Sequence, residues 1–305
     1  MKMNVKMLLM IIKRNLKMFF KDKGMFFVSL ITPAILLVLY ATFLGNVYKD
    51  SFLMALGGTV SVSEKALGGY VGGQLVSSIL AVSCVTVAFC SNVLMVQDKA
   101  NKSLNDIKIT PVSPSYVAIG YYAASLLSTL IVCFGAMLVC FGYLAFIGWY
   151  LSALDVLLLV CDVILVAMFG TVLSSVIYFF FSTQGQISAV GTIVSSGYGF
   201  ICGAYMPISQ FSKGLQTVIS FLPGTYATSL FRNHSMRGAL EAMTDEGVPK
   251  AALDELMDVV DCNVYFFGNR VGEGTKYIIL ILTIAILIGV YVFLNVMRTK
   301  KARAK

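Results

Sequence analysis

The sequence predicts an all-α membrane protein with six transmembrane helices. Of its 305 residues, 58% are hydrophobic and only 12% are charged, and the mean hydropathy is +0.85. Soluble domains are roughly half apolar and about a quarter charged. Several apolar runs are long enough to cross the hydrocarbon core, which takes about 20 helical residues. These runs are apolar on every face, whereas transmembrane strands would alternate apolar and polar residues.

The apolar runs define one transmembrane domain over residues 25–297. The expected spans are 25–44, 74–96, 116–147, 155–181, 187–205 and 277–297. Residues 1–24 precede this domain, and a basic tail, residues 298–305, follows it. Together these spans predict a helix bundle.

The first 24 residues predict an amphipathic helix that lies in the membrane interface. Lysines and Arg14 occupy the faces between apolar residues that recur at helical spacing, namely Val5, Leu8, Leu9, Ile12, Leu16, Phe19 and Phe20. A cleaved signal peptide is disfavoured, because the first apolar run continues to spanning length. The sequence leaves open whether this helix is a lipid anchor or a docking element.

The distribution of charge predicts that both termini are cytoplasmic. With the N-terminus inside, fifteen of the 23 lysines and arginines fall on the inner side, and ten of the 15 acids fall in the two longer outer loops. An excess of Lys and Arg marks the cytoplasmic side. We expect a multi-pass protein of a bacterial cell membrane. The net charge of +8 then reflects contact with anionic lipid, and no basic patch interleaved with aromatic residues indicates nucleic-acid binding.

Catalytic and metal-binding patterns are missing from the sequence. His234 is the single histidine, and we expect it in a loop or at the interface. Most of the seven cysteines fall within spans, where they act as small apolar residues; a Cys202–Cys262 disulfide is left open. The segment 268–276 lacks the spacing of a phosphate-binding loop. The glycine pairs near residues 57, 68 and 72 are interpreted as a flexible outer loop.

Two features inside the membrane stand out. In the fifth span, small residues repeat every four positions, at Gly191, Ser195, Gly199 and Gly203. Such a ridge allows close approach of another helix, either as packing alone or as a subunit interface or pathway. In the fourth span, Asp155 is expected to cap the helix at the interface. Asp162 lies deeper and should face the bundle interior, since an ionised Asp in the bilayer costs about 2.5–3.5 kcal/mol.

The outer loop, residues 206–276, is predicted to contain short re-entrant helices. Its first part is apolar yet broken by Pro207, Gly214 and Pro223. Irregular backbone at membrane depth requires shielding by protein. After Pro249, an amphipathic helix is expected, with an apolar stripe of Leu253, Leu256, Met257 and Val260.

In this arrangement the chain resembles the permease subunit of type-2 ATP-binding-cassette (ABC) exporters. Three stretches carry the resemblance: the basic amphipathic start with Pro33 in the first span, the cytoplasmic-loop pattern SLNDIKITPVS, and the pattern after the fifth span that includes Pro207, Pro223, Tyr226 and Arg232. The chain departs from the family in having Lys102 where Gly is usual, Lys108 where an apolar residue is usual, and no second Pro near Ser212.

The resemblance implies that the polar loop after the second span is a coupling helix that docks on a cytoplasmic ATPase. The candidate coupling residues are Asp98, Lys102, Leu104, Asp106, Ile107, Thr110 and Pro111. Physically, Leu104 and Ile107 could form a small apolar face, and Pro111 would end the helix. The alternative is a solvated connector, since charged loops are common on the cytoplasmic side.

The sequence therefore predicts a permease that pairs with a second copy or a close homologue and binds two ABC ATPase subunits. The resemblance implies that ATP and Mg belong to the partner and that this chain binds no cofactor and has no ATPase site. Its cargo would be an amphiphile, such as a drug, an antimicrobial peptide or a lipid-like molecule. Two alternatives stay open: an ion-coupled secondary transporter that uses Asp162, and a non-transporting membrane scaffold.

Overall fold

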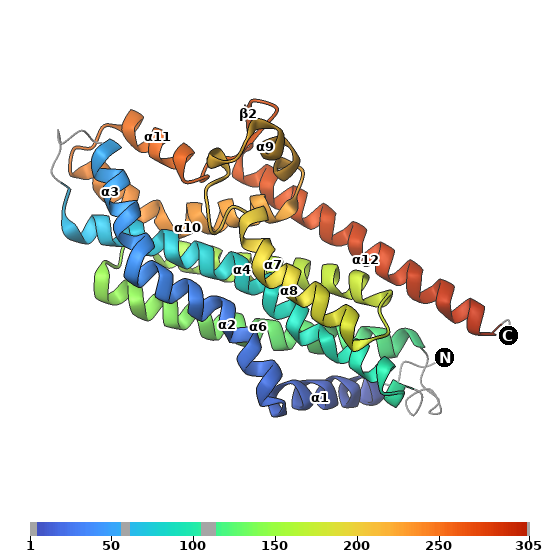
Figure 1. The fold of residues 1–305 in the computed structure, drawn as a ribbon. Coiled ribbons are helices and arrows are strands. Elements are labelled where there is room, and N and C mark those ends of the chain that lie inside the picture. The colour runs from blue at the N-terminus through green and yellow to red at the C-terminus, as the bar shows by residue number, and fades with distance from the viewer. Residues whose placement is uncertain (1–4, 56–61, 105–113, 304–305) are drawn as a thin grey trace.

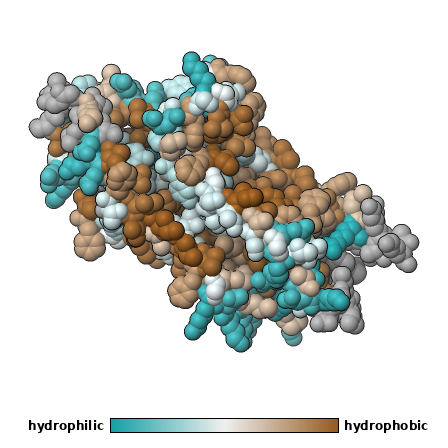
Figure 2. All heavy atoms as spheres, viewed as in Figure 1, coloured by the Kyte–Doolittle hydropathy of each residue, from teal (hydrophilic) through white to brown (hydrophobic). Residues whose placement is uncertain are grey.

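The computed structural model describes residues 5–55, 62–104 and 114–303 and is almost entirely helical (Figure 1). Within these described ranges, five helices are long and apolar enough to cross a membrane, at 23–50, 64–100, 115–147, 153–179 and 273–298. The prediction of an all-α membrane protein is confirmed. The hydrophobic surface forms a broad zone across the molecule, with hydrophilic residues gathered at its two ends (Figure 2).

The first half of the chain supplies an amphipathic helix and three long helices. Its elements are α1 (Val5–Lys21), α2 (Lys23–Leu39), the π-helical turn η1 (Tyr40–Leu44), α3 (Gly45–Ala55), α4 (Glu64–Ala100) and α6 (Pro114–Ile147). Asp22 separates α1 from α2 and caps the latter by accepting a hydrogen bond from the Met25 amide. The chain therefore turns sharply between α1 and the spanning helix that follows (Figure 1).

The second half supplies two long helices with a set of short elements between them. These are α7 (Ala153–Phe179), α8 (Gln184–Ile201), the 3₁₀ turn η2 (Ile208–Gln210), α9 (Lys213–Ser220), α10 (Pro223–Asp245), α11 (Lys250–Val259), the strands β1 (Tyr265–Phe266) and β2 (Asn269–Arg270), and α12 (Glu273–Arg303). The two strands pair antiparallel in a small hairpin that the sequence did not predict. The start of α1 and the end of α12 lie at the same end of the molecule (Figure 1).

Helix α4 is the centre of the bundle. It packs against α2, α6, α7, α8 and α10, and nearly all of its residues from Ala66 to Val96 are buried. Our interpretation of its first glycines as a flexible loop is wrong. A Cβ at Gly68 would lie 2.6 Å from the carbonyl oxygen of Ile147, and one at Gly73 would lie 2.6 Å from that of Ser235. These glycines let α4 approach neighbouring backbones closely, which a residue with a Cβ would prevent.

The predicted fifth span corresponds to α8, which is not among the five helices that meet the criteria for a membrane span. It has 18 residues, and small and polar side chains such as Gln184 and Gln186 dilute its apolar character. The count of six spans therefore stays a prediction. At the start of α7 the cap is Ser152, with Asp155 three residues later completing a capping box, which corrects the expectation that Asp155 is itself the cap.

Candidate functional site

The first candidate site begins at Asp98, in the last turn of α4. Its carboxylate accepts two hydrogen bonds from the Arg14 guanidinium, at 2.5 and 3.1 Å, and a third from the Tyr121 hydroxyl. Asp98 is buried, so it does not present a free charge to the solvent. Hydrogen bonding to this carboxylate raises the pKa of Arg14 further, which keeps the guanidinium charged. The contact joins α1, α4 and α6 at one point.

Lys99 and Lys102 lie at the C-terminal end of α4 and have different roles there. The Lys99 ammonium donates to the backbone oxygens of Tyr178, Phe179 and Phe181 at 2.9–3.4 Å, and so caps the C-terminal end of α7. Asn101 is the C-cap residue of α4. Lys102 follows it and has a backbone φ of 62°. This left-handed conformation explains why a glycine is usual at this position in the exporters that the chain resembles.

Of the remaining coupling candidates, the structure describes only Leu104. Leu104 is half-buried and packs against the core near Tyr121. It therefore contributes to the bundle in addition to any contact outside it. Asp106, Ile107, Thr110 and Pro111 lie outside the described residues, and their role in coupling stays a prediction.

A second candidate site surrounds Asp162 in the interior of the bundle. Its Oδ2 lies 2.6 Å from His234 Nδ1, and its Oδ1 accepts a hydrogen bond of 2.6 Å from the Tyr277 hydroxyl. Asp162 and His234 are 0% and 1% exposed. The expectation that Asp162 faces the interior is confirmed, whereas the expectation of a loop or interfacial His234 is wrong. Helices α7, α10 and α12 supply one residue each, and no short sequence pattern signals such a cluster.

Only part of the small-residue ridge of the predicted fifth span packs against other residues of this chain. Around Gly191 there is open space, while a Cβ at Gly199 would collide with the ring of Tyr205. The Tyr205 hydroxyl donates to the Ser195 carbonyl oxygen at 3.4 Å. Gly203 lies beyond the end of α8 and has a φ of +76°, which a residue with a Cβ rarely adopts. Gly199 and Gly203 therefore serve the local fold, and Gly191 leaves a face uncovered.

Arg232, one of the candidates in the segment predicted to be re-entrant, joins distant parts of the chain. Arg232 is fully buried and donates to Asp261 at 3.2 Å and to the Gly203 carbonyl oxygen at 2.5 Å. Asp261 also accepts from the Ile208 amide at 2.7 Å, and burial raises the pKa of this carboxyl despite the arginine beside it. Through these contacts α10 fixes the chain on both sides of α9. A buried pair of this kind is costly to break from one side.

Pro207, Pro223 and Tyr226 have simpler structural roles. Pro207 precedes η2, and Pro223 is the first residue of α10, where its missing N–H costs nothing. The Tyr226 hydroxyl donates to the Ser220 carbonyl oxygen at 2.6 Å and so ties the end of α9 to α10. In the described part of the chain, Cys202 and Cys262 are both buried free thiols, and no group of metal-binding side chains is found.

The fold and these contacts define a multi-pass helical membrane protein. Residues 7–234 match the family model for the ABC-2 type transporter. The match covers most of the chain, and the chain therefore belongs to the ABC-2 type transporter family. It is a permease of an ABC transporter, a membrane component without an ATPase of its own, and members of this family typically work with ABC ATPase subunits. Searches of curated proteins and of solved structures found no match.

Proposed function

We propose that the chain is the membrane subunit of an exporter that moves an amphiphilic substrate out of the cell, driven by ATP that a separate ABC ATPase hydrolyses with Mg. The observation that carries this proposal is the contact of Asp98 with Arg14 and Tyr121. It stands just before the segment 105–113, where the coupling helix is predicted. A displacement of that segment would act on α1, α4 and α6 together, because a buried, charge-assisted contact links all three.

The second copy required by this mechanism would pack against α8. Most of its residues are exposed, including the apolar Ile193 and Phe200, and α8 carries no charged side chain. The open space around Gly191 allows another helix to approach closely. Cargo would then pass between the two permeases. The exposed apolar surface and scarcity of charge on this face favour an amphiphile as cargo.

A second candidate function is ion-coupled transport through Asp162. The cluster of Asp162, His234 and Tyr277 favours it, because ionisable residues buried among spanning helices often mark ion pathways. The two mechanisms differ in their energy source. Transport by reconstituted protein that stops when an uncoupler is added, with ATP still present, would favour this candidate over the exporter.

The exporter is tested by purifying the permease together with its ATPase and measuring ATP hydrolysis with candidate amphiphiles. Ile107→Asp should reduce association by roughly tenfold or more, since a charge placed in an apolar contact is costly. Leu104 is a poorer choice for this test, because its side chain packs inside the bundle. The matched control is Val259→Asp, an exposed apolar residue on α11.

Normal association of the Ile107→Asp variant, together with cargo-stimulated hydrolysis like that of the wild type, would contradict the proposed coupling. Equal loss in the Val259→Asp control would indicate a general defect in folding. The expected result is a variant that is inserted in the membrane in normal amount but no longer co-purifies with the ATPase.

A further inference from the structure

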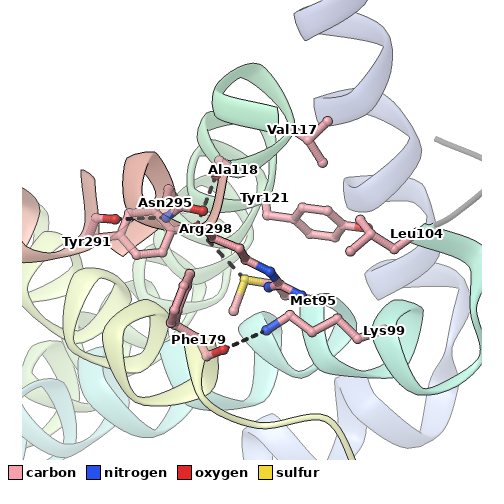
Figure 3. A pocket seen from close by; sticks show the side chains of 10 residues that line it. All are labelled: Met95, Lys99, Leu104, Val117, Ala118, Tyr121, Phe179, Tyr291, Asn295 and Arg298. Atoms are coloured by element: carbon pink, nitrogen blue, oxygen red, sulfur yellow. Dashed lines mark hydrogen bonds between the residues drawn. The ribbon is translucent and has the colours of Figure 1, made fainter. Parts of the chain in front are cut away.

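Two cations face the same aromatic ring where α4, α7 and α12 meet. Lys99 lies at the end of α4, Arg298 near the end of α12, and Phe179 at the end of α7. The Lys99 Nζ is 5.7 Å from the centroid of the Phe179 ring, and the Arg298 Cζ is 5.6 Å from it. Figure 3 shows the three side chains converging on one hollow.

These three residues also line two hollows with mainly apolar walls. The first, of about 300 Å³, lies between α4, α6 and α12, and its walls include Met95, Leu104, Val117, Tyr121 and Tyr291. The second, of about 560 Å³, adds Phe180, Phe181, Phe293, Leu294 and Met297. Phe180 and Phe293 are 65% and 61% exposed, so the second hollow opens to the side of the bundle. The cation pair stands where the two hollows adjoin.

The positive charge at this point has no acidic partner among the described residues. The ion pairs in that part of the chain involve Arg14, Arg232 and Arg237, and Asp162 contacts His234, so no acid is paired with Lys99 or Arg298. Carbonyl oxygens satisfy the hydrogens of Lys99 but do not neutralise its charge. Two like charges beside apolar walls repel each other and lose hydration. An anion between them would offset both costs.

The position of the pair indicates which anion that is. Lys99 and Arg298 stand at the ends of two helices that are long and apolar enough to cross a membrane, 64–100 and 273–298. Basic pockets between transmembrane helices are typical sites for anionic lipid headgroups. We propose that an anionic phospholipid binds here, with its phosphate accepting hydrogen bonds from Arg298 and attracted by the nearby charge of Lys99, and with its acyl chains in the two hollows. This inference goes beyond the proposed export function and does not depend on it.

The test measures lipid retention by the purified permease in nonionic detergent, using native mass spectrometry. Phosphatidylglycerol should be retained in preference to phosphatidylcholine with the same chains. Arg298→Gln should weaken retention of phosphatidylglycerol about tenfold, or roughly 1.4 kcal/mol, and leave phosphatidylcholine unchanged. Arg298→Lys should keep most of the preference. The matched control is Lys17→Gln, which removes one exposed charge from α1.

A second variant tests the hollow instead of the charge. Ala118 lines the first hollow, so Ala118→Phe should occupy it while Lys99 and Arg298 stay in place. Retention of two-chain phosphatidylglycerol should then fall more than that of its single-chain form. Normal elution on size-exclusion chromatography and an unchanged helical circular-dichroism signal would show that each variant is folded.

Two results would overturn the proposal. Retention of phosphatidylglycerol by Arg298→Gln that equals that of Lys17→Gln would show that the cation pair does not select the lipid. Displacement of phosphatidylglycerol by an equal concentration of glycerol phosphate would show that the pair binds a soluble anion, without a role for the hollows.

Discussion

At the scale of single residues, the backbone of Lys102 is strained because the residue adopts a left-handed conformation. A residue with a Cβ at a φ of 62° incurs a cost of about 1–2 kcal/mol that glycine avoids. We therefore expect Lys102→Gly to stabilise the protein by about 0.5–1 kcal/mol, after allowing for the greater freedom of glycine in the unfolded chain. The midpoint of thermal unfolding of the purified permease should rise.

The control is Lys17→Gly, in the interior of α1, which should destabilise that helix by about 1 kcal/mol. A fall in the unfolding midpoint for Lys102→Gly as large as that for Lys17→Gly would contradict the assigned role of Lys102. Both substitutions remove a lysine side chain. Because the unfolding midpoint is expected to rise for one and fall for the other, the difference between them reports the backbone conformation at each position.

Asp162 and His234 make a second prediction at this scale. Asp162→Asn replaces one carboxyl oxygen with an amide group and leaves a buried donor with an imperfect partner, which costs about 1–3 kcal/mol. Asp162→Asn, His234→Gln and the double variant together form a mutant cycle. We expect a coupling energy of about 0.5–3 kcal/mol, because the two side chains are in direct contact. Additive changes in the free energy of unfolding would show that the contact contributes little.

At the scale of elements, one ion pair joins α1 to the bundle in addition to apolar packing against α6. Arg14→Gln leaves the buried Asp98 with a single strong donor, Tyr121, and should cost about 1–3 kcal/mol. Hydrogen exchange in α1 should become faster, while exchange in α7 should not change. Lys13→Gln, on an exposed face of α1, is the control. Equal exchange in α1 for both variants would mean that apolar packing alone holds the helix.

Elements with a strong local signal could be predicted from the sequence, and contacts between distant segments could not. Pro249 indicated the start of the helix over Lys250–Val259, and unbroken apolar runs indicated the long helices. The glycines at the start of α4 were misinterpreted, because close packing and loop formation select the same residue. The partners of Asp162 were missed for another reason: His234 and Tyr277 are 72 and 115 residues away along the chain.

At the scale of the whole molecule, the charge distribution predicts which side of the membrane each end faces. Single cysteines at positions 102 and 301 should react with a membrane-impermeant reagent only after permeabilisation, while one at position 254 should react in intact cells. Each cysteine is introduced into a variant whose Cys161, the exposed native thiol, is replaced by Ala. Labelling of position 102 in intact cells would reverse the predicted orientation.

The length and central position of α4 restrict which sequence changes this chain can accept during evolution. Its 37 residues span about 55 Å, more than the roughly 30 Å of the hydrocarbon core. Helices α1, α2, α3, α6, α7, α8 and α10 all contact it. A substitution in α4 alters the contacts of one side chain. Insertion of a single residue would rotate the rest of α4 by about 100° about the helix axis, and so would displace every contact that follows the insertion. Variation in length among descendants of this chain should therefore concentrate in the outer loops, and α4 should vary only by substitution.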